Sequence, residues 1–361
     1  MTADPDTRLR RGWTTGACAA AAARAAYAAL LTGAFPDPVT IRLPGGEAPS
    51  FPLALKERDG DCARAGVVKD AGDDPDVTNG ALVIAEVRAA VAGAGIRFFA
   101  GPGVGTVSLP GLPLGVGEPA INPGPRAMIA AALAAVRASP DAEVTLSIPG
   151  GEALAAQTMN GRLGIRGGLS ILGTSGIVIP YSCAAWIASI HRGVDVARAL
   201  GLGHIAGATG RGSEAAVQLL YALPETALID MGDFAGGLLK YLRRHPVPRL
   251  TLAGGFGKMA KLAEGHLDLH SSQSRIEGAA LARRLERLAA PAAAIDAVRA
   301  SASAGQALTL LAASWPALAA ALAESVAAGA REVALATLAG GVAVDVAIFD
   351  REGELLGHAG G

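Results

Sequence analysis

The sequence predicts two domains: an α+β domain with an internal duplication over residues 1–198, and a Rossmann-like α/β domain with a parallel sheet over residues 199–361. Three observations predict this division. The length of 361 residues is sufficient for two hydrophobic cores. A ten-residue segment of the first half recurs at an offset of 105 residues. From Gly203 onward, strand-like and helix-like segments alternate along the chain.

The repeat consists of "VTIRLPGGEA" at residues 39–48 and "VTLSIPGGEA" at residues 144–153, with seven of ten positions identical. The same offset pairs residues 14–31 with residues 119–136, and in both copies a loop precedes an Ala-rich helical pattern. We therefore expect an ancient duplication of a helix–strand–turn–strand unit. The alternating pattern around Pro-Gly-Gly in the first copy predicts a hairpin.

The second half predicts a doubly wound sheet. Strands are expected at residues 204–210, 226–232 and 249–255, each followed by a helix, at residues 211–223, 233–245 and 256–265. Ala-rich helices follow over residues 275–329. The C-terminal residues 344–360 are typical of a hairpin that extends the sheet.

Composition excludes several function classes. With a net charge of −1, the chain is not expected to bind nucleic acid. The most apolar helical segment contains Arg24 and is too short to span a membrane. The three cysteines, Cys18, Cys62 and Cys183, form no C-x-x-C pair and fit free thiols in a reducing compartment. We expect a cytoplasmic protein without a membrane anchor.

An acidic stretch, "VVKDAGDDPDVTNG" at residues 67–80, stands out in a chain with only 17% charged residues. It gathers one lysine and four aspartates within eight residues: Lys69, Asp70, Asp73, Asp74 and Asp76. It is not an EF-hand loop, because Asn79 replaces the required glycine and Ala85 the required glutamate. Two explanations remain: a turn that caps a helix starting near Thr78, or a site.

In the site interpretation, Lys69, Asp70 and Asp73 are the candidate catalytic residues, because they follow directly on a buried strand. A carboxylate there, Asp70 or Asp73, would act as a general base or bind a cationic ligand.

Glycines follow the predicted strands of the second half, where parallel sheets bind ligands. Gly207, Gly210 and Gly254 are candidate cofactor-binding positions, and Asp230 at the end of the second strand suits ribose hydroxyls. The segment "AGGFGKMAK" resembles a phosphate loop, but Met259 replaces the required Ser or Thr, which argues against ATP hydrolysis. Tight βα turns are the alternative explanation for each glycine.

Six segments, in order along the chain, resemble the cobalt-precorrin-5B C(1)-methyltransferase family of the oxygen-independent cobalamin pathway. They are "RRGWTTGACAAAAA", "VVKDAGDDPDVTNG", "AINPGPRAMI", "GGLSILGTSGIVIPYS", "GDFAGGLLKYL" and "LAGGFGKMAKLAEGHLDLHSSQSR". The resemblance implies transfer of a methyl group from S-adenosylmethionine to C1 of a cobalt-bearing tetrapyrrole, which gives cobalt-precorrin-6A. It implies a tetrapyrrole substrate that carries the cobalt, and other cobalamin-pathway enzymes as possible partners.

Such a substrate carries acetate and propionate carboxylates, which basic side chains would bind. The candidates are Arg126, Lys240, Lys258, His266, His270 and Arg275, together with Arg166 and Lys261. On a strand, His266, Asp268 and His270 would share one face. We expect substrate contact or a structural role there, and no protein-bound metal, because the cobalt would arrive inside the macrocycle.

Alternatives remain open on two points. S-adenosylmethionine is expected at Gly207, Gly210, Gly254 and Asp230, with the Gly-rich residues 167–176 as the rival site. The function itself has two alternatives: another S-adenosylmethionine- or dinucleotide-dependent enzyme, and a non-catalytic carrier of tetrapyrroles.

Overall fold

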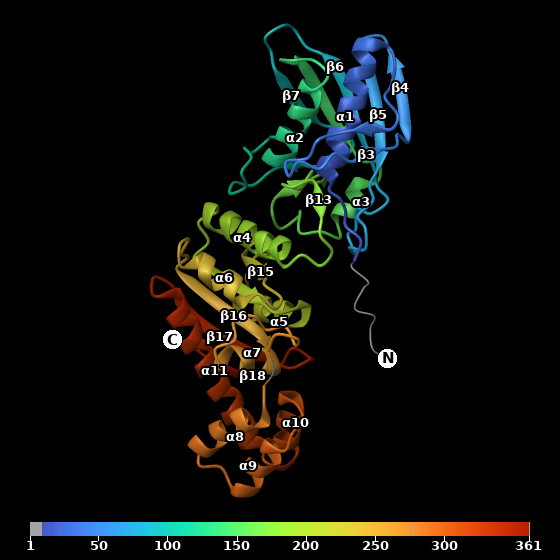
Figure 1. Ribbon diagram of the computed structural model, residues 1–361. Coiled ribbons are helices and arrows are strands. Elements are labelled where there is room, and N and C mark those ends of the chain that lie inside the picture. The colour runs from blue at the N-terminus through green and yellow to red at the C-terminus, as the bar shows by residue number, and fades with distance from the viewer. Residues whose placement is uncertain (1–8, 275, 361) are drawn as a thin grey trace. The chain divides into compact units, whose positions relative to one another are not determined.

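The computed structural model describes residues 9–274 and 276–360, and it divides into two compact units, Met1–Ser182 and Cys183–Gly361 (Figure 1). The division comes before helix α4 (Cys183–Ala199), whereas the sequence predicted it after residue 198. The reason is packing, since α4 contacts α6 and β15 of the second unit. Each unit has its own hydrophobic core.

The first unit is built on a five-stranded sheet of order β4-β5-β6-β10-β7. Its strands are β4 (Leu55–Asp59), β5 (Cys62–Val68), β6 (Leu82–Ala89), β10 (Ala142–Ser147) and β7 (Ile96–Ala100). Helix α1 (Thr15–Thr32) packs on β5 and β6 and lies beside α2 (Pro123–Ala134). All the alanines of α1 except Ala28 are buried, and their small side chains allow the helix to approach the sheet closely.

Four short strand pairs complete the first unit. They are β1 (Gly12–Trp13) with β13 (Ile177–Val178), β2 (Val39–Thr40) with β3 (Ser50–Phe51), β8 (Gly103–Val104) with β12 (Gly168–Leu169), and β9 (Thr106–Val107) with β11 (Ile165–Arg166). The β2–β3 pair is antiparallel and confirms the hairpin expected in the first copy of the repeat.

The two copies of the repeat differ locally after their Ala-rich helices. In the second copy, the strand is β10 of the large sheet, and its Pro-Gly-Gly leads into the short helix α3 (Gly151–Ala155) instead of a hairpin. The same residues therefore take two conformations because their tertiary partners differ.

The second unit contains a five-stranded sheet of order β15-β14-β16-β17-β18. The strands are β14 (His204–Ala208), β15 (Leu228–Asp230), which follows the 3₁₀ turn η1 (Glu225–Ala227), β16 (Arg249–Gly255), β17 (Ala343–Phe349) and β18 (Leu355–Ala359). The first four are mutually parallel, and β18 pairs antiparallel with β17. The expected strand–helix alternation and the C-terminal hairpin are confirmed.

The strand order is not that of a Rossmann fold. Numbered along the chain, it is 2-1-3-4-5, the order of flavodoxin-like sheets, with the last strand reversed. Helices α5 (Arg211–Tyr221) and α6 (Ala235–Leu242) cover opposite faces, because Tyr221 contacts His204 of β14 and Leu238 lies against Gly207 of the same strand. The order reverses between β14 and β16, which makes their carboxyl ends the switch point.

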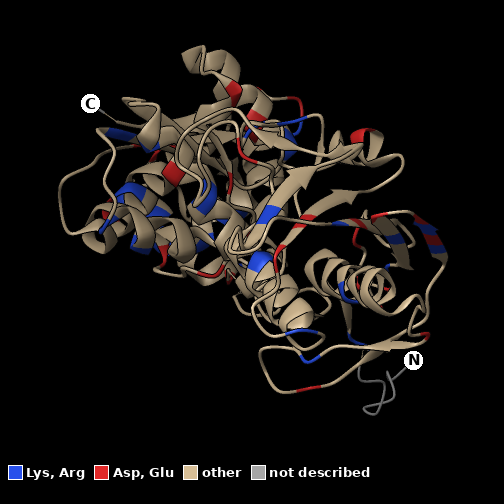
Figure 2. Cartoon of the chain, turned by 90° about the horizontal axis from the view of Figure 1, so that it is seen from above, with Lys and Arg blue, Asp and Glu red and all other residues tan. Residues whose placement is uncertain are grey.

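Helices fill the connection between β16 and β17, as the Ala-rich sequence predicts. They are α7 (Phe256–Ala263), α8 (Gly278–Arg287), α9 (Ala292–Arg299), α10 (Ala304–Ser314) and α11 (Pro316–Leu338). No helix of the described residues is long and apolar enough to cross a membrane. Basic and acidic segments are interspersed along the chain (Figure 2).

Candidate functional site

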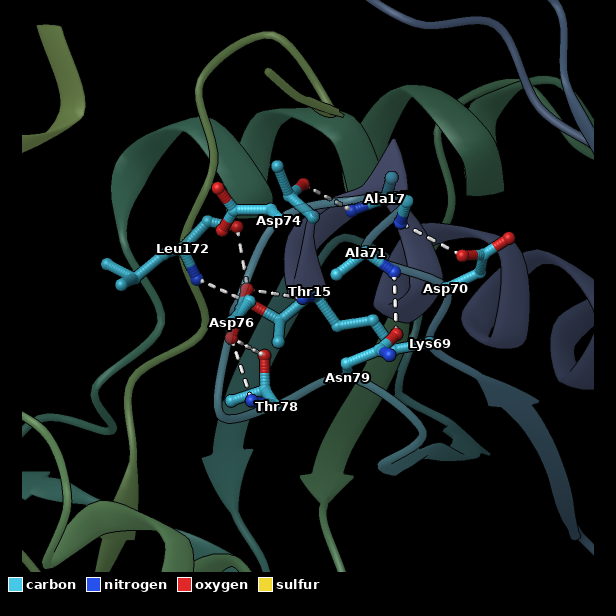
Figure 3. A network of polar contacts seen from close by, with 12 residues as sticks. Thr15, Ala17, Lys69, Asp70, Ala71, Asp74, Asp76, Thr78, Asn79 and Leu172 are labelled. Carbon is cyan, nitrogen blue, oxygen red and sulfur yellow. Dashed lines mark hydrogen bonds and ion pairs between the residues drawn. The ribbon is translucent and has the colours of Figure 1, made fainter. Parts of the chain in front are cut away.

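Four segments that lie far apart in the sequence meet in the first unit (Figure 3). Strand β1 pairs with β13 on one side, and on the other the Trp13 N–H donates to the carbonyl of Asp70 at 2.7 Å. The Asn122 N–H, at the start of α2, donates to the carbonyl of Ile171 at 3.1 Å. The first four segments of the family resemblance therefore form one cluster, which we call the acidic site.

Two glycines allow the chain to cross itself at this site. A Cβ added to Gly12 would lie 2.0 Å from the carbonyl carbon of Ala71, and one added to Gly72 would lie 2.1 Å from the carbonyl oxygen of Arg10. Gly72 also has a φ of +68°, a conformation that favours glycine. Both positions therefore require glycine if β1 and the acidic stretch are to touch.

Asp70 is engaged by Arg10. The Arg10 guanidinium donates two hydrogen bonds to the Asp70 carboxylate, one of them from Nη2 to Oδ1 at 2.9 Å, and the Gly72 N–H donates to the same oxygen at 2.9 Å. The bond from Arg10, followed by that from Gly72, lowers the pKa of Asp70. A lower pKa makes Asp70 a weaker general base than an aspartate with the ordinary pKa.

Asp73 and Asp74 each hold a different segment. Asp73 accepts the N–H of Arg10, and its side chain is exposed. Asp74 accepts the N–H of Tyr181 at 2.8 Å. The two carboxylates thus attach the acidic stretch to the chain before β1 and to the loop after β13.

Lys69 lies in the interior of the unit, with 2% of its surface exposed, and its Nζ is 2.5 Å from Asp76 Oδ2. The other oxygen of Asp76 accepts the N–H and the hydroxyl of Thr78, at 2.7 and 2.6 Å. Burial acts to raise the pKa of Asp76, but the hydrogen bonds from Lys69 and Thr78 outweigh it, and the pKa is lowered. Lys69 is therefore placed to fix the loop through Asp76, and its side chain is not exposed on the surface.

No helix begins near Thr78, so the capping explanation for the acidic stretch is wrong. Residues 70–81 form turns that lead directly into β6. The carboxylates hold turns and neighbouring segments instead of a helix end.

The rival Gly-rich segment, residues 167–176, also borders the acidic site. The Gly16 N–H at the start of α1 donates to the carbonyl of Leu172 at 2.9 Å, and the Leu172 N–H donates to Thr15 Oγ1 at 2.9 Å. A Cβ on Gly173 would lie 2.3 Å from Thr14 Oγ1, the cap of α1. Gly173 therefore allows this segment to pass close to the start of α1.

In the second unit, the predicted cofactor residues gather at the carboxyl edge of the sheet, with one exception. Gly210 follows β14, Asp230 ends β15, and Gly254 lies near the end of β16. Gly207 instead faces the core, because a Cβ there would lie 2.4 Å from Leu238. A Cβ on Gly210 would meet no atom within 4 Å of it, so the space beside Gly210 is open.

Three of the predicted substrate-binding cations already have protein partners. Arg126 donates to Glu118 at 2.6 Å and to the carbonyl of Ile121 at 2.8 Å. Lys258 donates to the carbonyl of Thr209 at 2.9 Å, and Lys261 to that of Leu269 at 2.6 Å. These contacts indicate structural roles.

The remaining predicted cations lie on separate elements. Arg166 is exposed on β11 and Lys240 is exposed on α6, and these belong to different units. His266, Asp268 and His270 do not lie on a strand, and His270 Nδ1 is 2.7 Å from Ser272 Oγ. Arg275 lies outside the described residues. Across residues 9–274 and 276–360, no group of three His, Cys, Asp or Glu side chains has the arrangement of a metal site.

Sequence reasoning missed Arg10 and Tyr181. Arg10 carries the ion pair to Asp70, 60 residues away, and a pairing over that separation leaves no local pattern. For Tyr181 a signal exists: it follows Pro180, where a turn often requires a positive φ at the next residue.

Sequence comparisons find similar known proteins for both units. Residues 2–180 match the sequence profile of the family described as CbiD, and residues 268–360 match the profile described as CbiD, C-terminal domain. Proteins named cobalt-precorrin-5B C(1)-methyltransferase are similar over nearly the whole chain. The one from Bradyrhizobium sp. strain BTAi1 is 58% identical over 99% of this chain and 96% of that protein. The one from Rhodospirillum rubrum is 53% identical over 99% of both.

A crystal structure described as a cobalamin biosynthesis protein (cbiD) from Archaeoglobus fulgidus is 29% identical, covers 69% of this chain and 78% of that chain, and has a TM-score of 0.39.

Proposed function

Because the chain belongs to the CbiD family, we infer that it is a cobalt-precorrin-5B C(1)-methyltransferase. It transfers a methyl group to C1 of a cobalt-bearing tetrapyrrole in cobalamin biosynthesis. The observation that carries this inference is the identity of 58% over 99% of the chain with a protein of that name. The acidic site supports it, because four of the six segments that resemble the family meet there.

We propose S-adenosylmethionine as the methyl donor. Its sulfonium activates the methyl group, so the protein chiefly has to align sulfur, methyl and ring carbon. The carboxylates of the acidic site suit a cationic centre such as the cobalt of the substrate. Asp73 is the better candidate for an assisting base, since it is exposed, whereas Arg10 lowers the pKa of Asp70.

S-adenosylmethionine is proposed to bind at the carboxyl edge of the sheet in the second unit. Three features support this position: the switch point between β14 and β16, the open space beside Gly210, and Asp230 at the end of β15. Gly254 would serve close packing beside Thr209, since a Cβ there would lie 2.7 Å from Thr209 Oγ1. The Gly-rich residues 167–176 remain the rival site.

We propose a cytoplasmic location, because of the chemistry of the cysteines. Cys18, Cys62 and Cys183 are free thiols, which suits the reducing cytoplasm. The substrate and product are intermediates of one pathway, so transient contact with other cobalamin-pathway enzymes is a reasonable expectation.

The test is single-turnover transfer of labelled methyl from S-adenosylmethionine to cobalt-precorrin-5B under anaerobic conditions. We expect label at C1 of the product, and a slower transfer by the variant Asp73→Asn with unchanged binding of the donor. Tight tetrapyrrole binding without label in the product would instead identify a carrier. Hydride transfer or a bound dinucleotide would identify a different enzyme.

A further inference from the structure

Tyr181 has a backbone conformation that is unfavourable for a bulky residue. Its φ is +56°, in the left-handed region, where the Cβ of an L-residue is crowded by the backbone. The other non-glycine residues with positive φ within residues 9–274 and 276–360 are small: Ser139, Ala222, Ala289 and Ala339. Strain of this kind persists where the surroundings hold it, and it is frequent at ligand-binding positions.

The surroundings of Tyr181 hold the turn rigidly. The Tyr181 N–H donates to Asp74 Oδ1 at 2.8 Å, and β13, which ends three residues earlier at Val178, is paired with β1. Yet the residue is 68% exposed. A tyrosine that folding alone required would bury its ring, since burial of the ring is what stabilises an aromatic residue.

Further apolar side chains are exposed on the segments that meet at the acidic site. Leu172 and Ile179 are 53% and 55% exposed, and Val77 belongs to the acidic stretch itself. Figure 3 shows Leu172 beside Thr15, whose Oγ1 accepts the Leu172 N–H at 2.9 Å. We call Tyr181, Leu172, Ile179 and Val77 the apolar rim. Exposed apolar residues on segments that also carry carboxylates suit a ligand with an apolar face and a cationic part.

We propose that Tyr181 is a substrate-binding residue whose ring stacks on the conjugated macrocycle of the tetrapyrrole, with the rest of the apolar rim in contact with it. This inference rests on the proposed function. A metallated tetrapyrrole has large π faces, which match an exposed aromatic ring. The carboxylates of Asp73 and Asp74 would face its cationic central metal, away from its acetate and propionate groups. The turn holds the backbone of Tyr181 through the bond of its N–H to Asp74, so little backbone entropy is lost on binding.

The experiment compares three variants for anaerobic binding of cobalt-precorrin-5B, followed by its visible absorbance and by quenching of tryptophan fluorescence. Tyr181→Phe keeps the ring and should bind within about twofold of the unchanged protein. Tyr181→Ala and Tyr181→Gly remove the ring and should bind about tenfold more weakly. Tyr181→Gly also relieves the backbone strain, so its thermal stability should be equal or higher.

A matched control is Phe99→Ala, because Phe99 is also an exposed aromatic residue of the first unit but pairs with Thr145 on the sheet face opposite α1. Its affinity should be unchanged, and S-adenosylmethionine affinity should be unchanged in all four variants. Normal binding by both Tyr181→Ala and Tyr181→Gly overturns the proposal, as does weak binding by Tyr181→Ala that Tyr181→Gly restores. If the unchanged protein binds no tetrapyrrole, the proposed function itself fails.

Discussion

Lys69 places an ammonium group in the interior of the first unit, where it bonds to Asp76 at 2.5 Å. Removing the charge of one partner leaves the other buried without compensation, which destabilises a protein more than loss of a surface ion pair. The pair therefore has a measurable signature in stability, and its dependence on pH has a definite sign.

Because the pKa of Asp76 is lower in the folded state, its ionised form stabilises the fold above the unfolded value of about 4. That contribution is lost as the pH falls through the folded value. We expect the free energy of unfolding in urea to fall as the pH is lowered from about 5, and to fall less steeply in Asp76→Asn. The same variant should be less stable at pH 7 by about 1–2 kcal/mol.

Asp61→Asn is the control. Asp61 is an exposed aspartate whose Oδ1 forms a weak ion pair with Arg88 Nη1, at 3.7 Å. Its unfolding should follow the unchanged protein at every pH. An Asp76→Asn protein with the same pH profile as the unchanged protein would show that the pair contributes nothing to folding.

Among elements, the crossing of β1 and the acidic stretch depends on glycine. Gly72 and Gly80 lie in the same stretch and have similar φ values, +68° and +77°. A Cβ on Gly72 would collide with the backbone of Arg10, whereas a Cβ on Gly80 would meet nothing within 4 Å. Substituting each glycine by alanine therefore distinguishes the cost of a positive φ from the cost of a steric collision.

Gly80→Ala should cost about 1–2 kcal/mol of unfolding free energy, the cost of the left-handed conformation alone. Gly72→Ala should cost more than about 3 kcal/mol, because strain and displacement of β1 add. It should also speed hydrogen exchange at the Trp13 amide, which bonds to Asp70. Equal losses in the two variants would mean that the crossing is dispensable.

For the whole molecule, the open question is which unit holds S-adenosylmethionine. The two units have separate cores, and each contains one candidate: the Gly-rich residues 167–176 in the first and the carboxyl edge of the sheet in the second. A side chain added at the edge should block binding there without disturbing the core. Gly210 suits this purpose, because the space beside it is open.

Gly210→Val should weaken S-adenosylmethionine binding at least tenfold, as measured by calorimetry, with only the small loss of thermal stability expected of valine at the N-cap of α5. Gly203→Val is the matched control: Gly203 also has open space around it, but it precedes β14 at the opposite edge. It should bind normally. Normal binding of S-adenosylmethionine by Gly210→Val would favour residues 167–176 as its site.

Much of the fold was predictable, because element types depend on local patterns. The alternation after Gly203, the C-terminal hairpin and the Ala-rich helices were all visible in the sequence. The strand order was not, since the choice of 2-1-3-4-5 depends on which neighbours pair, and the periodicity of a strand is the same in any order. The domain boundary was misplaced for the same reason: α4 is a helix in either unit, and only its packing assigns it to the second.

The sequence alone determined the family, the element types and the importance of the acidic stretch, because these depend on residue identity and local spacing. Only the tertiary structure decided what each charge does. In the fold, Lys69 pairs with Asp76 inside the unit, and Arg10 forms an ion pair with Asp70. Asp74 accepts a hydrogen bond from the backbone N–H of Tyr181. The physical reason is that hydrogen bonds and desolvation act over a few ångströms in space, between residues that lie as far apart in the chain as Asp74 and Tyr181, 107 positions.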